Sequence, residues 1–426
     1  MRAFIKQIIK SIENLLINNE PKEFEVVQKK ANGKCPSIKF HSNLAKYFDK
    51  QGNYYDRNAE LINIRKLSEL LWQLTKLEDW ELLKKRITDI EFFNLLWEKK
   101  LVELRYTLQL LTSKLETKLW ILYKHLIDDQ NIKYEGINLA SILIDFGYSY
   151  YASEILSRIQ SNTIGKKASK IRLKMLKLAG KAHFQRGNYW ISLDAFEDLL
   201  RHSGKINDKV GLITSYNYQA KIYLIFGELE KADKLLKLGY SILCNFKHNL
   251  LMIDNLIIQF NYAFKLNENL DYIYDSISSK IKGVIDPELE DELLLISGLY
   301  FIKSKDFPRA ESYLNKYQSK CRLYGNLDKL QNCLGYEALI QIYKNNINKA
   351  FHILEEKEHL CYEISSAFGL QETRGLQSIV CMKKREYKKA LKLVNVKKNI
   401  CNEHSYALDY KESIIIENEI LSKTKN

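Results

Sequence analysis

Apolar residues recur three and four positions apart along most of the chain, the spacing that places them on one face of an α-helix. Only four prolines and 17 glycines interrupt these stretches in 426 residues. Leu, Ile, Lys, Glu, Tyr and Asn dominate the composition, which also favours helices over sheets. The pattern therefore predicts an almost wholly helical protein.

Turns divide the helical pattern at a nearly constant interval. They are expected at seven positions spaced by 40, 40, 40, 38, 40 and 40 residues: Gly147, Gly187, Gly227, Asn267, Lys305, Asn345 and Arg385. In six of the seven units, one small residue lies seven positions before the turn and another lies five positions after it. Gly180 and Ser192 are such a pair, and their small side chains let two helices fold back with their backbones close together. A period of this length indicates a solenoid of stacked helix pairs.

A large apolar residue completes the repeat, four positions after the second small residue. It is present in six units as Leu156, Phe196, Leu236, Leu314, Leu354 and Val394. The fourth unit instead has Phe260, Tyr272 and Ser276 at the three places. We therefore expect the fourth unit to be degenerate and to bend the array.

Three of the seven cysteines also follow the repeat. Cys321, Cys361 and Cys401 are 40 residues apart, which is what a packing position in a repeat produces. Metal ligation is the alternative interpretation of these residues. The odd number of cysteines and the lack of a C-x-x-C pair predict reduced thiols in a cytoplasmic protein.

The order of small residue, turn, Tyr or Leu, Ala and large apolar residue resembles the tetratricopeptide repeat over residues 131–405. The usual period of that family is about 34 residues, so the longer period implies longer helices or links. The resemblance implies a right-handed α-α superhelix of about seven helix pairs, with the first helix of each pair lining the concave surface. A last helix, Tyr406 to Leu421 within residues 406–426, is expected to cap the array with Lys411, Glu412, Glu417 and Glu419 on its outer face.

The N-terminal part of the chain does not follow the 40-residue period. Between Arg65 and Trp97 the apolar spacing predicts three short helices, with Asp79 and Asp89 as caps of the second and third. This stretch and HSNLAKYF at His41 to Phe48 resemble the helical linker that precedes the repeats in STAND signalling ATPases of the NACHT and nephrocystin kind. The resemblance implies a helical linker module at residues 49–130.

Residues 1–48 are expected to form a separate N-terminal segment. Phe4 to Leu16 predicts an amphipathic helix, and the sequence around Asn32-Gly33 predicts one short β-hairpin, together the remnant of a winged helix. Charged residues interrupt every apolar run before it reaches the ~18 residues of a membrane span. We therefore expect no membrane association.

Motifs for catalysis and cofactor binding are absent from the sequence. No G-x-x-x-x-G-K-[ST] loop for nucleotide phosphates, no H-E-x-x-H and no G-x-S-x-G elbow occurs. His352 and His359 share a helical face, but such histidines are ordinary on a solenoid surface. We expect a protein that is not an enzyme and that binds no metal or cofactor.

The net charge of +14 bears on the choice of partner. Asn162 to Gly187 contains eight Lys or Arg and no acidic residue, and its helix is expected on the concave surface. The groove residues predicted there combine lysines with aromatic rings: Lys174, Lys177, Lys181, Phe184, Asn217, Tyr218 and Lys221. An acidic peptide or protein segment is the partner that this surface favours, and nucleic acid is the runner-up. The alternative is that the lysines form only a solvated helix face.

A second candidate surface lies further along the chain, where Tyr336 and Tyr343 follow an apolar stretch. With Glu292, Leu295, Ile296, Leu299, Ile302, Leu339 and Ile342 it would form an apolar patch for a partner helix or for self-association. The alternative is that these side chains pack between neighbouring helices.

Taken together, the sequence predicts a protein–protein interaction scaffold, or the sensor arm of a STAND-type signalling or defence system. A nucleic-acid-binding solenoid is the alternative function. The sequence does not name the partner.

Overall fold

A computed structural model of the protein describes residues 38–162, 168–246, 248–266, 268–281 and 287–424. The helix predicted at Phe4 to Leu16 and the hairpin predicted around Asn32-Gly33 lie outside these residues. The chain divides into two compact units, Met1–Glu103 and Leu104–Asn426. Each unit is described by itself.

In the described part of the first unit, α-helices are interrupted by one short strand pair. The elements are α3 (Ile38–Lys50), β1 (Tyr54–Asp56), β2 (Leu61–Ile62), α4 (Ile64–Leu77), α5 (Trp80–Ile87) and α6 (Ile90–Lys99). The strands are antiparallel, with Tyr54 opposite Ile62. This strand pair lies at a different place from the hairpin predicted around Asn32-Gly33. Helix α3 packs against α4, where His41 Nδ1 lies 2.7 Å from Gln73 Oε1.

The three short helices predicted between Arg65 and Trp97 are confirmed as α4, α5 and α6. Their predicted caps are also confirmed, because the Asp79 carboxylate accepts a hydrogen bond from the backbone N–H of Leu82 and Asp89 accepts one from Phe92. Each bond satisfies a donor that the first helical turn leaves without a partner.

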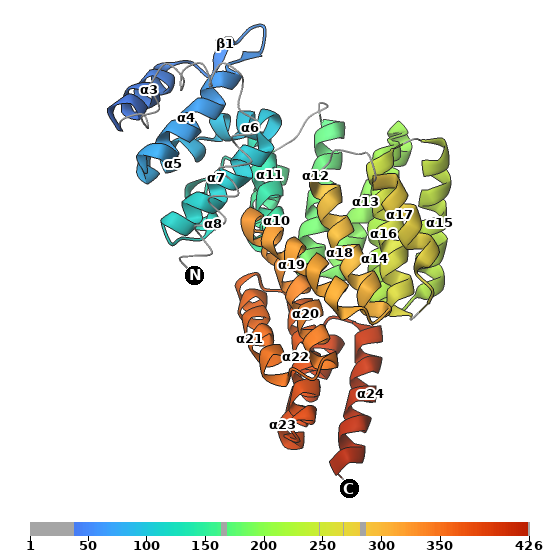
Figure 1. The fold of residues 1–426 in the computed structure, drawn as a ribbon. Coiled ribbons are helices and arrows are strands. Elements are labelled where there is room, and N and C mark those ends of the chain that lie inside the picture. The colour runs from blue at the N-terminus through green and yellow to red at the C-terminus, as the bar shows by residue number, and fades with distance from the viewer. Residues whose placement is uncertain (1–37, 163–167, 247, 267, 282–286, 425–426) are drawn as a thin grey trace. The chain divides into compact units, whose positions relative to one another are not determined.

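The second unit begins with α7 (Leu101–Lys114, whose first three residues belong to the first unit), α8 (Leu119–Leu122), α9 (Lys124–Ile127) and a 3₁₀ turn, Tyr134–Gly136. Seven helix pairs follow within the residues described. They are α10 (Ile137–Asp145) and α11 (Ser149–Asn162), α12 (Ala168–Gln185) and α13 (Tyr189–Ile206), α14 (Lys209–Phe226) and α15 (Leu229–Asn245), α16 (Asn249–Lys265) and α17 (Asp271–Ile281), α18 (Pro287–Lys303) and α19 (Phe307–Tyr324), α20 (Leu327–Tyr343) and α21 (Ile347–Glu363), and α22 (Ala367–Lys383) and α23 (Tyr387–Glu403). Helix α24 (Ala407–Thr424) ends the array (Figure 1). The predicted all-α solenoid is confirmed.

The turns within the helix pairs lie where the sequence places them. All six predicted turn residues in the described ranges have positive φ: Gly147 (89°), Gly187 (78°), Gly227 (77°), Lys305 (61°), Asn345 (60°) and Arg385 (62°). Asn267 lies outside the described residues. A single left-handed residue ends a helix by redirecting the backbone, so each of these residues closes the first helix of its pair.

The small residues of the repeat lie where paired helices touch. Ala140, Ala220 and Ala338 are fully buried, and a Cβ built on Gly180 would lie 2.7 Å from the ring of Phe196. In the fourth unit Phe260 is fully buried, whereas Tyr272 is 81% exposed. The bend expected at this unit stays a prediction.

The three periodic cysteines are buried in the second helices of their pairs, as the packing interpretation predicts. Burial raises the pKa of the Cys321 thiol to about 12 and that of Cys361 to about 11. Within the described ranges no three Cys, His, Asp or Glu side chains form a group that fits a metal ion. These thiols are packing groups that stay protonated at neutral pH.

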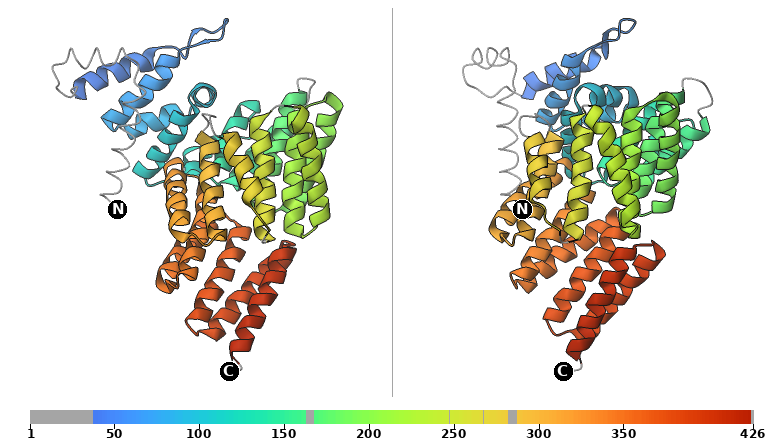
Figure 2. Two further views of the ribbon diagram at one scale, coloured as in Figure 1. Left: turned by 45° about the vertical axis from the view of Figure 1, so that its right-hand side comes forward. Right: turned by 90° about the vertical axis from the view of Figure 1, so that its right-hand side faces the viewer.

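Within the second unit, the turns of the first three helix pairs approach the last helices of the array (Figure 2). A Cβ built on Gly147 would lie 3.0 Å from Ile364, and one on Gly187 would lie 2.6 Å from the Tyr406 hydroxyl. The Tyr148 hydroxyl donates a hydrogen bond to Glu363 at 3.0 Å. Helix α14 also contacts α24. The array therefore winds back on itself, and its first helices enclose a cavity.

Of the helices described, none has both the length and the apolar character that a membrane crossing requires.

Candidate ligand-binding cavity

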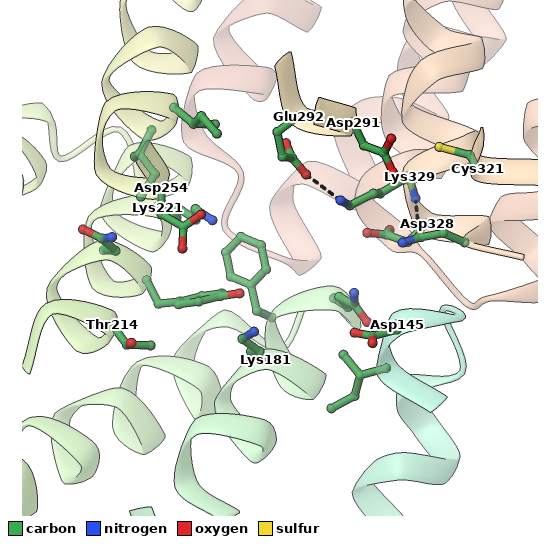
Figure 3. A pocket seen from close by; sticks show the side chains of 18 of the residues that line it. Asp145, Lys181, Thr214, Lys221, Asp254, Asp291, Glu292, Cys321, Asp328 and Lys329 are labelled. Atoms are coloured by element: carbon green, nitrogen blue, oxygen red, sulfur yellow. Dashed lines mark hydrogen bonds and ion pairs between the residues drawn. The ribbon is translucent and has the colours of Figure 1, made fainter. Parts of the chain in front are cut away.

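A cavity of about 420 Å³ lies among the first helices of successive pairs, entirely within the second unit (Figure 3). Its charged lining residues are Arg105, Asp145, Lys177, Lys181, Lys221, Asp254, Asp291, Glu292, Asp328 and Lys329. The rest of the lining combines apolar and aromatic side chains, including Phe184 and Tyr218, with uncharged polar ones such as Asn217 and Thr214. The volume is within the range of small-ligand and peptide side-chain pockets.

Six of the nine residues predicted for binding line this cavity. They are Lys177, Lys181 and Phe184 on α12, and Asn217, Tyr218 and Lys221 on α14. Lys181 and Lys221 occupy the same position in neighbouring repeats, 40 residues apart. The stacking of α12 beside α14 therefore brings their ammonium groups to one region.

The other three predicted residues lie elsewhere. Lys174 is exposed and donates a hydrogen bond to Asn138 Oδ1 at 2.7 Å. Tyr336 packs against the apolar core around α18 to α20, and Tyr343 is 61% exposed and stacks on Phe307.

Of the two alternatives that the sequence left open for the apolar residues of the fifth unit, a surface patch or helix packing, the structure shows helix packing. Ile296, Leu299 and Ile302 are at most 5% exposed and belong to the core between helices. Only Glu292 of that set reaches the cavity. These isoleucines and leucines serve helix packing, the alternative that the sequence left open.

Lys177, Lys181 and Lys221 form what we call the lysine end of the cavity. The ring of Tyr218 lies beside two of these side chains and holds them in place. The ammonium of Lys221 lies 4.7 Å from the Tyr218 ring centroid and that of Lys181 lies 5.8 Å from it. Phe196 stacks on the same ring at 4.5 Å and is itself fully buried. The ring is therefore held by packing, and cation–π attraction keeps two lysines beside it.

The surroundings of Lys177, at the lysine end, disfavour its positive charge. Burial and the nearby charge of Lys181 lower its pKa. The described residues place no hydrogen-bond acceptor or carboxylate in direct contact with its ammonium. An anionic group of a ligand would relieve this cost, because an opposite charge favours the protonated amine.

The opposite end of the cavity, which we call the acidic end, consists of Asp291, Glu292 and Asp328 (Figure 3). Asp291 forms an ion pair with Lys320 at 2.6 Å, and Glu292 forms one with Lys329. Asp328 accepts only a long side-chain hydrogen bond, 3.5 Å from Gln331, among the residues described. Burial raises the pKa of Asp328.

Asp254, on α16, lies beside Lys221 at the lysine end (Figure 3). Its side chain is open to the cavity, and the loss of bulk hydration there raises its pKa, while the charge of Lys221 opposes that rise. The cavity as a whole has five cationic and five acidic lining residues. It is therefore a charge-separated site and differs from the uniformly basic groove expected from the sequence.

Of the acidic residues that line the cavity, only Glu292 was predicted to lie on a candidate surface, although the repeat carries a signal for Asp254 as well. Counting along the repeat, Lys174, Thr214, Asp254 and Glu292 share one position of the first helix. Thr214, Asp254 and Glu292 all line the cavity. Aligning the units position by position would have placed Asp254 on the concave surface together with Glu292.

Asp328→Asn is expected to change how stability depends on pH. Because the folded pKa of Asp328 is raised, the folded state binds this proton more tightly than the unfolded chain does. Stability contributed by this carboxyl is present below its unfolded pKa and is lost as the pH rises through the raised folded pKa. Urea unfolding measured from acidic to neutral pH should show that the free energy of unfolding falls less steeply with pH in the variant than in wild type. At pH 7 the variant should be the more stable protein. Parallel curves for the two proteins would contradict the assignment.

No protein-family model matches the chain, and no curated protein matches it in sequence. Among solved structures, the chain is similar to the crystal structure of Rap protein complexed with competence and sporulation factor, with 12% identity and a TM-score of 0.46. The match covers 82% of this chain and 98% of that chain. A similarity this low carries no information about function.

Proposed function

We propose that the repeat array is a non-enzymatic interaction module that holds a peptide segment of a partner protein in the cavity. The observation that carries the proposal is the lysine end, where Lys177 and Lys221 have no ion-pair partner among the described residues and flank the fixed ring of Tyr218. Packing leaves little freedom to Tyr218, so binding there loses little side-chain entropy. An anionic group next to an apolar or aromatic side chain is the feature of a peptide that suits this arrangement.

The geometry favours a peptide over nucleic acid, the runner-up. A phosphate backbone needs a continuous track of cations, because each phosphate carries a charge along the strand. Here Asp254 lies among the lysines and three carboxylates line the opposite end. A nucleic acid strand that ran through the cavity would bring its phosphates close to these carboxylates, which opposes binding.

The test is to select peptides from a random heptapeptide display library with the purified full chain. The double variant Lys177→Glu/Lys221→Glu should lose the peptides that the wild-type protein enriches, because both cations at the lysine end are reversed. The matched control is Lys205→Glu/Lys234→Glu, which makes the same charge change at two exposed lysines outside the cavity lining. Equal enrichment by the cavity variant and the control would overturn the proposal. Salt-sensitive binding of a labelled single-stranded DNA, lost only in the cavity variant, would move the function to nucleic acid.

The N-terminal unit bears on the kind of signalling system in which the repeat array acts. We propose that residues 49–130 act as the linker between the array and a signalling partner, so that the array is the sensor arm of a STAND-type system. Support comes from the HSNLAKYF stretch and from the three capped helices that follow it. Co-expression with a candidate ATPase subunit and co-purification through residues 49–130 would test this step, and loss of the array alone should leave that association intact.

A further inference from the structure

The charges that line the cavity are separated along its length. At the lysine end, three ammonium groups surround one carboxylate, that of Asp254. At the acidic end, three carboxylates line the cavity with one lysine, Lys329. Arg105 and Asp145 form an ion pair with each other and leave this balance unchanged. The cavity therefore has a positive end and a negative end while its total charge is close to zero.

Internal ion pairs do not cancel this separation. Asp291 and Glu292 are bound by Lys320 and Lys329, so they are largely satisfied within the protein. Asp328 has no lysine or arginine in ion-pair contact, and its carboxylate accepts only the 3.5 Å hydrogen bond from Gln331 among the described residues. It is the acidic-end counterpart of Lys177. Each end thus retains at least one partly buried charge, Lys177 at one and Asp328 at the other, that no opposite charge contacts in the described part of the protein.

We infer that the ligand is dipolar: a peptide segment that presents a carboxylate to Lys177 and Lys221 and an ammonium or guanidinium group to Asp328. This inference rests on the proposed function and adds the charge pattern and direction of the bound segment. A ligand cation at Asp328 would keep that carboxyl ionised, just as a ligand anion at Lys177 would keep the amine protonated. A purely acidic segment would satisfy one end and bring like charge toward the other, which opposes binding.

Charge complementarity at both ends also fixes the direction in which the segment lies. The same segment turned end to end would place like charges together at each end, so the cavity selects one orientation by repulsion as well as by attraction. Tyr218 and Phe184 lie against each other with ring centroids 5.6 Å apart and offer an apolar surface in the cavity. The expected segment therefore has an apolar or aromatic residue between its acidic and its basic residue.

Four pools of fluorescent short peptides with blocked termini test the inference. All share a randomised apolar and aromatic centre, and their flanking residues are Asp and Lys, Asp and Asp, Lys and Lys, or Ser and Ser. Binding to the full wild-type chain is measured by fluorescence anisotropy. The Asp and Lys pool should bind about tenfold more tightly than the Asp and Asp pool, as expected for one additional charge-assisted contact.

Variants of the protein test which end of the cavity binds which charge of the peptide. Asp328→Asn should remove the advantage of the Asp and Lys pool while the Asp and Asp pool still binds, and Asp328→Lys should reverse the preference. Lys177→Met/Lys221→Met should weaken both of these pools. Equal affinity of the two pools for wild type would overturn the dipolar inference and leave the proposed function standing, even if an Asp328 variant failed to fold. Binding of none of the four pools to wild type would overturn the proposed function as well.

Discussion

Phe196→Ala is expected to lower the free energy of unfolding of the repeat array by about 3–5 kcal/mol, the range for deleting a fully buried aromatic ring. Phe196 is fully buried and fills the space left by Gly180 on the opposite helix. It also stacks on Tyr218, so its loss removes support from a ring that lines the cavity. Urea unfolding followed by circular dichroism measures the change, and the peptide affinity of the folded variant measures the effect on Tyr218.

The degenerate fourth unit supplies the matched control for this substitution. Tyr272→Ala also removes an aromatic ring from a repeat position, but that ring is 81% exposed. Its effect should stay within about 0.5 kcal/mol, as for other surface changes. Similar losses for Phe196→Ala and Tyr272→Ala would mean that the helix pairs are not held by the packing described.

Glu372→Gln is expected to destabilise the array by about 3 kcal/mol, because it leaves a buried cation without its counter-charge. The Lys357 side chain is fully buried between α20, α21 and α22. Its ammonium donates to the Gln331 carbonyl at 3.1 Å, to Gln331 Oε1 at 3.0 Å and to Glu372 Oε2 at 3.2 Å. The amide introduced by the substitution would keep the shape of the carboxylate while removing its charge. Urea unfolding of the full chain measures the loss.

Two further substitutions test whether the effect of Glu372→Gln comes from the burial of the ion pair or from the loss of a charge as such. Asp233→Asn breaks the exposed pair with Lys237 and should cost less than about 1 kcal/mol. Lys357→Met removes the buried cation itself and should cost less than Glu372→Gln, since an apolar side chain of similar length needs no counter-charge. A larger loss for Lys357→Met would show that the hydrogen bonds to Gln331 matter more than the ion pair.

The sequence was sufficient for features that depend on neighbouring helices alone. The turn residues, the close approach of Gly180 and Ser192, the Asp79 and Asp89 caps and the buried Cys361 all follow from local spacing along the chain. In each case the residues that interact are close in sequence, so their spacing determines the contact.

The cavity was only partly predictable because its two ends come from different units. Lys177 and Lys221 belong to the second and third helix pairs, whereas Glu292 and Asp328 belong to the fifth and sixth. How far the array turns between them depends on small rotations at every helix contact, which a single sequence does not reveal. The same uncertainty in rotation explains why the sequence left open whether Ile296 lies on a surface or in the core, where it is found.

The return of the last helices to the first turns has a consequence for how this chain can change over time. Open arrays gain and lose repeats readily, since each unit contacts only its neighbours. Here Gly187 lies against Tyr406, and Tyr148 is hydrogen-bonded to Glu363, 215 positions away. Duplication or deletion of a single 40-residue unit between them would displace both contacts by one helix pair. The number of repeats is thus fixed by closure, and new specificity has to arise by substitution within the existing units.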